Sequence, residues 1–250
     1  MTTYYVDMSL GNDANAGTSE GSGNAWKTIQ KAADTATAGD KVWIKASADY
    51  TEQVDFDTQT GTVASWISFE GYTTTTGDNG RITWTGSSAR SYCLVSNGTP
   101  KFISIANVDF KGSTSSPLRI TTAAGTHWHF ENCYFTGGST LVTNASYVTW
   151  QNVCFVRCKI YSFTSHGVPG AIFARNTLWS QCAVLNNGSK GFYFLNYPYS
   201  LAIVRCLIAG NTGDGIDIGS YQAGTIISEC TVANNGGHGI TIGTLGSTNI

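Results

Sequence analysis

Three residues with the chemistry to bind a ligand or transfer a proton recur at a fixed spacing near the end of the chain. Lys190, Asp214 and His238 are each 24 residues apart, and Asp217 follows Asp214 by three positions. An ammonium, a carboxylate and an imidazole on one ridge can bind a sugar or perform acid–base catalysis. The candidate catalytic residues are therefore Asp214, Asp217 and His238.

Exposed aromatic residues supply a second kind of candidate. Tyr193, Tyr197 and Tyr199 lie close together in the chain, just after Lys190. Tyrosine rings can stack on sugar rings, so these four residues form a candidate glycan-binding set. The run from Tyr197 to Tyr199, with Pro198 between them, is equally well explained as a rigid turn between strands.

The same residues also have a purely structural interpretation. The pattern Asn-x-Gly-x-Gly-Ile-x-Ile is typical of a turn followed by a buried strand, and the residue between the glycines then simply faces solvent. A glycosidase needs two carboxylates about 5–9 Å apart, a range that Asp214 and Asp217 could approach. We favour the structural interpretation and expect no metal site and no cofactor.

A solenoid would place these residues side by side. Six stretches align between residues 103 and 232, and their equivalent positions are 24 or 25 residues apart, a period that marks a solenoid. One apolar column is Ile105, Phe130, Phe155, Trp179, Ile203 and Ile227, and another is Phe110, Phe135, Ile160, Val184, Ile208 and Val232. The third strands begin at Phe192, Ile216 and Ile240. Each coil therefore has three faces of parallel strand.

Three further columns accompany the apolar ones. We expect a polar residue to turn the chain between two short strands in each coil, at Asn107, Asn132, Arg157, Gln181, Arg205 and Glu229. A column of small residues follows it, which we expect to be buried free thiols after its first member: Val108, Cys133, Cys158, Cys182, Cys206 and Cys230. Asn187, Asn211 and Asn235 predict an amide ladder at a second turn.

The N-terminal segment differs from the repeat. Residues 4–11 predict a strand, residues 25–36 an amphipathic helix and residues 41–46 another strand. Loops are expected at residues 73–80 and, as an insertion carrying His166, at residues 162–170. Loops of this kind are where solenoids usually place recognition.

The N-terminal segment resembles the N-terminal cap and first coil of pectate-lyase-like β-helix proteins. The resemblance rests on four motifs in this order: Tyr-Tyr-Val-Asp, Gly-Asn-Asp, Trp-Lys-Thr-Ile-Gln-Lys-Ala and Ala-Gly-Asp-Lys-Val-Trp-Ile-Lys. The resemblance implies an all-β fold, a single-stranded right-handed parallel β-helix whose N-terminal α-helix covers the first coil. We expect residues 1–56 to form the strand, capping helix and first coil. Residues 57–250 would form the remaining coils as one continuous domain.

Two later segments, Gly-Asp-Gly-Ile-Asp-Ile and Gly-His-Gly-Ile-Thr-Ile-Gly, also resemble motifs of the polygalacturonase family. The resemblance implies that Asp214 is an acid and that His238 supports it. Gly215 stands where that family has a second aspartate, the preceding coil lacks its Asn-Thr-Asp, and no later Arg-x-Lys follows.

Composition excludes several classes of function. Charged residues make up 12% of the 250 positions and the net charge is −2, which gives a nucleic acid no basic surface. No apolar run is long enough to span a membrane, and the N-terminus lacks the features of a secretion signal. Seven cysteines without a signal indicate a reducing compartment.

These observations favour a non-catalytic structural or recognition protein of a bacteriophage virion, made in the host cytoplasm. The start of the chain also loosely resembles β-helix proteins that phages often encode. The alternatives are a polysaccharide-degrading hydrolase or lyase and a non-catalytic glycan-binding module. We expect other virion subunits, or self-association as a homotrimer, to cover the last coil, because an uncovered coil exposes strand edges. Surface polysaccharide is a further expected partner.

Overall fold

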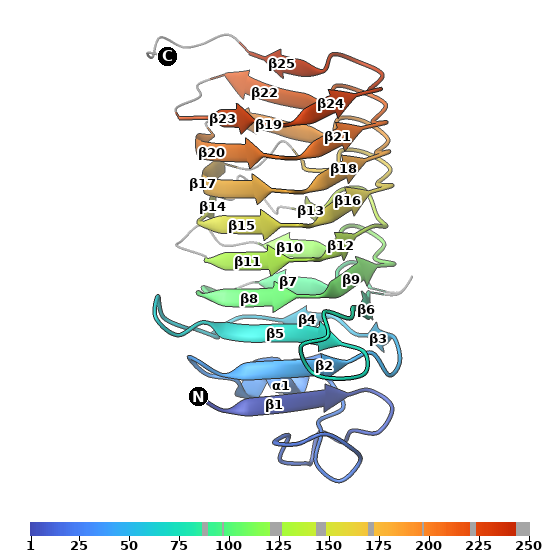
Figure 1. Cartoon of the computed structure of the whole chain (residues 1–250), viewed down its shortest axis with the longest axis vertical. Helices are drawn as coiled ribbons and strands as arrows, with labels where there is room; N and C mark the ends of the chain where they lie inside the picture. Colours follow the sequence, from blue (N-terminus) through green and yellow to red (C-terminus); the bar gives the residue numbers. More distant parts are fainter. Residues whose placement is uncertain are drawn as a thin grey trace.

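The chain winds into a stack of coils whose strands lie one above the other (Figure 1). The computed structural model describes residues 1–86, 90–96, 98–120, 127–143, 149–169, 173–196, 198–220 and 224–243. Within these ranges every strand-to-strand ladder is parallel, so the fold is a parallel β-helix with three walls. No helix among the described residues is long and apolar enough to cross a membrane.

The first wall is a ten-stranded sheet in the described part of the chain. Its strands in chain order are β1 (Thr3–Asp7), β2 (Lys41–Lys45), β5 (Ile67–Tyr72), β8 (Ile103–Ala106), β11 (Trp128–Glu131), β14 (Thr149–Gln151), β15 (Val153–Val156), β17 (Phe173–Ser180), β20 (Tyr199–Val204) and β23 (Ile226–Ser228). The wall runs from the N-terminal strand to the last coil without interruption.

The second wall is an eight-stranded sheet over the same described ranges. Its strands are β3 (Tyr50–Thr51), β6 (Ile82–Thr85), β9 (Val108–Lys111), β12 (Tyr134–Phe135), β16 (Lys159–Tyr161), β18 (Ala183–Leu185), β21 (Leu207–Ala209) and β24 (Thr231–Ala233). Each follows a first-wall strand of the same coil, so the two walls advance together.

The third wall consists of two smaller sheets. One contains β4 (Val54–Asp55), β7 (Leu94–Ser96), β10 (Leu118–Ile120) and β13 (Val142–Thr143). The other contains β19 (Phe192–Asn196), β22 (Ile216–Ser220) and β25 (Ile240–Ile242). Val168 joins them, because it forms a parallel bridge to Phe192, and the neighbouring Gly167 accepts a backbone hydrogen bond from Leu141 at 3.0 Å.

The predicted columns are confirmed by the strand register. Phe130 pairs with Phe155, which pairs with Trp179, and this column continues to Ile203 and Ile227. The rings of Phe155 and Trp179 stack with centroids 4.0 Å apart. Equivalent residues of successive coils stack because the register keeps each inward position above the same position of the previous coil.

The turn between the first and second walls is also as predicted. Its polar residue has positive φ in every aligned coil, from Asn107 (φ 60°) to Glu229 (φ 53°). The next residue of each coil points inward, and the cysteines at this position are free thiols. Each Sγ donates to backbone carbonyls, as in Cys182, which lies 3.4 Å from the oxygen of Phe155. Backbone carbonyls, rather than a disulfide, therefore satisfy the thiol column.

The N-terminal helix α1 spans Ile29–Thr35 and is shorter than predicted. Ala25 and Trp26 are not helical, because Trp26 forms a bridge to Val6 of the first wall. The buried side of α1 (Ile29, Ala32 and Ala33) joins the hydrophobic core at the N-terminal end of the stack (Figure 1). Both carboxylate oxygens of Glu52 accept backbone N–H groups of the first turn of α1, at 2.9 and 3.1 Å. This contact fixes the cap to the coil that it covers.

The prediction of an insertion at residues 162–170 is wrong. Phe163 to Val168 follow the backbone ladder of the next coil: Ser165 accepts from the N–H of Ser189 at 2.9 Å, and Gly167 donates to Lys190 at 3.0 Å. The segment is an ordinary turn that has Phe163 and Thr164 where the next coil has Asn187 and Gly188, although it keeps the second glycine as Gly167. His166 therefore falls in the same column as Lys190.

Candidate functional site

The predicted ridge lies where the chain enters the third wall. Lys190, Asp214 and His238 occupy equivalent positions on successive coils, since the residue after Lys190 donates to the carbonyl of Asp214 at 3.0 Å and the residue after Asp214 donates to that of His238 at 2.9 Å. Tyr193 pairs with Asp217, which pairs with Thr241. The turn and the strand after it thus present two parallel columns of polar side chains.

Lys190 joins the two columns. Its ammonium forms an ion pair with Asp217 on the next coil and lies 4.2 Å from the centroid of the Tyr193 ring. His166, one coil earlier, packs on the same ring with centroids 4.6 Å apart, and its Nδ1 accepts the backbone N–H of Lys190 at 3.4 Å. Sequence reasoning missed His166 because the turn was taken for an insertion; counting back 24 residues from Lys190 would have found it.

Asp214 faces the following coil instead. Its Oδ1 accepts the backbone N–H of His238 at 2.7 Å, and its Oδ2 accepts from the Thr241 hydroxyl at 3.2 Å. The His238 Nδ1 lies 3.5 Å from Oδ1, but its side chain is 85% exposed. Asp214 therefore connects two coils through hydrogen bonds, and the imidazole lies outside that connection. We refer to His166, Lys190, Tyr193, Asp214 and Asp217 as the third-wall cluster.

The pKa directions follow from these contacts. Partial burial alone would lower the pKa of Lys190, but the hydrogen bond and charge of Asp217 outweigh it and raise that pKa. Burial alone would raise the pKa of Asp214, but the His238 amide and the Thr241 hydroxyl lower it. Burial, and then the charge of Lys190, lower the pKa of His166. The cluster thus holds a charged ammonium, a charged carboxylate and a neutral imidazole at neutral pH.

The missing second aspartate has a structural cause. A Cβ atom on Gly215 would lie 2.6 Å from Val232 Cγ1 and 2.7 Å from the carbonyl oxygen of Gly239. No side chain fits at such distances without moving the next coil. The position that carries a second acid in polygalacturonases is closed to every residue except glycine in this chain.

Tyr193 and Tyr199 do not share a site. Tyr193 lies on β19 of the third wall, whereas Tyr199 begins β20 on the first wall, with the Arg175 guanidinium 5.5 Å from its ring. Tyr197 lies outside the described residues. The Tyr193 ring already contacts His166 and Lys190, so a ligand of the third-wall cluster would meet polar edges more than an open aromatic face.

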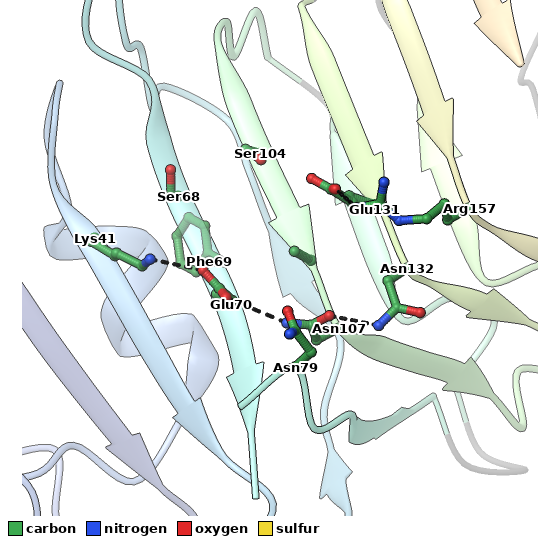
Figure 2. A pocket seen from close by; sticks show the side chains of 11 residues that line it. Lys41, Ser68, Phe69, Glu70, Asn79, Ser104, Asn107, Glu131, Asn132 and Arg157 are labelled. Carbon is green, nitrogen blue, oxygen red and sulfur yellow. Dashed lines mark hydrogen bonds and ion pairs between the residues drawn. The ribbon is translucent and has the colours of Figure 1, made fainter. Parts of the chain in front are cut away.

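A groove on the outer surface of the first wall is the other candidate, and sequence reasoning did not identify it. It encloses about 420 Å³, within the range of about 300–1,000 Å³ common for ligand sites. Figure 2 shows its polar side chains in a row across successive coils. We call this the first-wall groove; its lining residues are Lys41, Ser68, Phe69, Glu70, Asn79, Ser104, Ala106, Asn107, Glu131, Asn132 and Arg157.

The signal for the groove was present in the sequence. Glu70, Ala106 and Glu131 share one outward position on β5, β8 and β11, so a small residue separates two acids. The outward positions of the first wall had not been compared across coils. Among the described residues, no three His, Cys, Asp or Glu side chains are grouped so that they could hold a metal ion.

The walls, the turns and the stacked columns define a parallel β-helix solenoid that carries polar sites on its outer surface. The chain belongs to the family described as "Right handed beta helix region", whose model matches residues 92–250. The fold is therefore a right-handed parallel β-helix of the pectate-lyase-like kind, as predicted.

Two solved structures share this fold. The pectate lyase Pel9A is 15% identical with a TM-score of 0.60, and the match covers 94% of this chain and 79% of that one. A rhamnogalacturonan lyase is 18% identical with a TM-score of 0.56, and the match covers 98% of this chain and 63% of that one. No curated protein sequence matches the chain. At these identities the likeness establishes the fold alone.

Proposed function

We propose that the chain is a non-catalytic polysaccharide-recognition protein that binds glycan at the third-wall cluster. The observation that carries the proposal is the ion pair between Lys190 and Asp217 beside the Tyr193 ring. It places a donor, an acceptor and an aromatic edge together at partly exposed positions, which are the groups that sugar hydroxyls bind. The two structural neighbours are polysaccharide lyases by name, which supports a carbohydrate ligand.

The same contacts speak against catalysis by the cluster. A glycosidase acid needs a raised pKa, but the pKa of Asp214 is lowered and Asp217 is in an ion pair. A lysine that acts as a base needs a lowered pKa, but that of Lys190 is raised. Lys190 and Asp217 neutralise each other, and the cluster is suited to holding a ligand.

Binding and cleavage can be tested on the same samples. The full chain should bind one or more polysaccharides on a glycan array without releasing reducing ends or unsaturated products. The double variant K190Q/D217N replaces both charged groups by neutral amides, and it should weaken binding about tenfold, or about 1.4 kcal/mol. The control R205Q/E229Q removes the exposed Arg205–Glu229 pair of the first-to-second-wall turn and should leave binding unchanged.

Two results would reject the proposal. Failure of the full chain to bind any polysaccharide would remove recognition as the function. Cleavage of a polysaccharide that is lost in D214N or H238A would instead establish the rival hydrolase or lyase.

The virion role predicted from the sequence is part of the proposal and rests on sequence features alone. It implies that the chain is found by mass spectrometry among the structural proteins of purified phage particles. The predicted partner contact at the last coil also stays a prediction. In the structure Ile226, Ile240 and Ile242 of that coil are 56%, 45% and 58% exposed, which is the surface that such a partner would cover. Native mass spectrometry showing a stable monomer would contradict self-association.

A further inference from the structure

The first-wall groove owes its shape to one small side chain. Along the outward column, Glu70 and Glu131 stand one coil to either side of Ala106, so their backbones are about 9.6 Å apart, twice the coil spacing of about 4.8 Å. The Ala106 methyl group leaves the space between them open. A larger residue at this position would fill the groove.

Every charge that lines the groove is paired with another. Lys41 Nζ lies 2.8 Å from Glu70 Oε2 at one end, and Arg157 forms an ion pair with Glu131 at the other. Figure 2 shows one pair toward each end of the row of polar side chains, with Asn79 and Asn107 between them. Two cations and two anions cancel, so the groove offers no net charge to a ligand.

The amides along one side form a fixed chain. Asn132 Nδ2 donates to Asn107 Oδ1 at 2.7 Å, and Asn107 Nδ2 donates to Glu70 Oε1 at 3.4 Å and to the Gly71 carbonyl at 3.3 Å (Figure 2). Asn107 is buried, so this side of the groove is already in its final position before a ligand arrives. Preorganisation of this kind lowers the entropic cost of binding.

The groove also offers uncharged polar groups that are not engaged with other residues. Within the described residues, the Ser68 and Ser104 hydroxyls and the Asn79 amide have no hydrogen-bond partner. Asn79 comes from the loop at residues 73–80 and has φ of 58°. The Asp78 carboxylate holds that loop through five or more hydrogen bonds. It accepts, for example, the backbone N–H of Thr74 at 2.7 Å and that of Gly80 at 2.8 Å. These bonds lower the pKa of the Asp78 carboxyl group.

We propose that the first-wall groove is a binding site for a neutral sugar segment, separate from the third-wall cluster. Sugar hydroxyls donate to the remaining lone pairs of Glu70 and Glu131 and accept from Ser68, Ser104 and Asn79. An acidic sugar would place a carboxylate between two glutamates whose cations are already engaged. The site lies on a different wall from Lys190 and Asp217, so it does not depend on the function proposed for them.

The test uses the full chain and short neutral oligosaccharides of glucose, galactose and mannose, with oligogalacturonate as the acidic comparison. At least one neutral oligosaccharide should bind in calorimetric titration. A106F fills the groove from an outward strand position and should weaken this binding about tenfold or more, or about 1.4 kcal/mol. N79G keeps the left-handed backbone, removes one amide and should weaken it a few-fold.

Two controls locate the effect. Ala202 is an outward alanine of the same wall on β20, so A202F makes the same substitution away from the groove and should leave binding unchanged. K190Q/D217N, which removes the charges of the third-wall cluster, should leave the part of the binding that A106F removes unchanged, and this separates the two sites. The proposal is overturned if no neutral oligosaccharide binds, if A106F binds as well as the parent, or if oligogalacturonate binds equally well and competes.

Discussion

Asn211 positions the third-wall cluster, because it holds the turn that precedes Asp214 against the coils on either side. Its side chain is 1% exposed and makes four hydrogen bonds. Oδ1 accepts the backbone N–H and the side-chain amide of Asn187 at 3.1 and 2.8 Å. Nδ2 donates to the Val184 carbonyl at 3.2 Å and to Asn235 Oδ1 at 2.9 Å.

N211A should therefore be strongly destabilising. Each hydrogen bond contributes about 0.5–1.5 kcal/mol net, so losing four removes about 4 kcal/mol, within a range of about 2–6 kcal/mol. Typical domains have a total free energy of unfolding of about 5–15 kcal/mol, so the loss is a large fraction. N211D should be at least as harmful, because a carboxylate cannot donate to Val184 or Asn235.

Urea unfolding followed by tryptophan fluorescence and circular dichroism measures the effect, provided that the denaturant slope is unchanged. Asn235 makes three such bonds and is only half-buried, so N235A is a graded control with a smaller loss. The double variant N187A/N211A should lose less than the sum of the single variants, because either substitution alone already removes the bond from Asn187 Nδ2 to Asn211 Oδ1. A loss below about 0.5 kcal/mol for N211A would refute the view that the amide ladder carries this turn.

Three further predictions concern packing, pH and backbone contact. W179A should lose about 3–5 kcal/mol in urea unfolding and W179F much less, because the indole is fully buried against Phe155 at 4.0 Å. In the folded protein the pKa of His166 lies below its usual 6.5, so at acidic pH the unfolded chain binds more protons than the folded one. The contribution of neutral His166 to stability is therefore present above pH 6.5 and is lost as the pH falls toward the folded-state pKa. Urea midpoints of H166Q against the parent should show this dependence, and equal pH slopes would contradict it. G215A should lower the melting temperature by several degrees whereas G23A, which meets no atom within 4 Å, should not; equal melting temperatures would refute the proposed closure of this position.

Much of the third-wall cluster could be predicted from spacing. Lys190, Asp214 and His238 fall in one column because a constant coil length makes sequence separation equivalent to vertical position. The pairing within the cluster could not be predicted. Spacing places Lys190 beside Asp214, yet the side chain reaches diagonally to Asp217, and Asp214 instead contacts the next coil. Side-chain rotamers and local hydrogen bonds decide such choices, and periodicity carries no information on them.

The first-wall groove, in contrast, could not be predicted from spacing. Its residues come from β2, β5, β8 and β11, from the turns that follow first-wall strands, and from a loop whose length breaks the 24-residue period, so no fixed spacing connects Asn79 to Ala106. Their proximity depends on how the loop at residues 73–80 folds back, which Asp78 decides through its hydrogen bonds.

The sequence alone determined the solenoid, its three walls, the inward columns, the thiol column and the amide ladder, because these features repeat and each coil must bury the same positions. Only the tertiary structure decided which polar side chains pair, that residues 163–168 form an ordinary turn, and that the first-wall groove opens above Ala106. The physical reason is that the inward positions recur once per coil, so their burial appears in the sequence as apolar residues at a fixed period. A binding surface depends on contacts between particular side chains, which exist only after the coils have stacked.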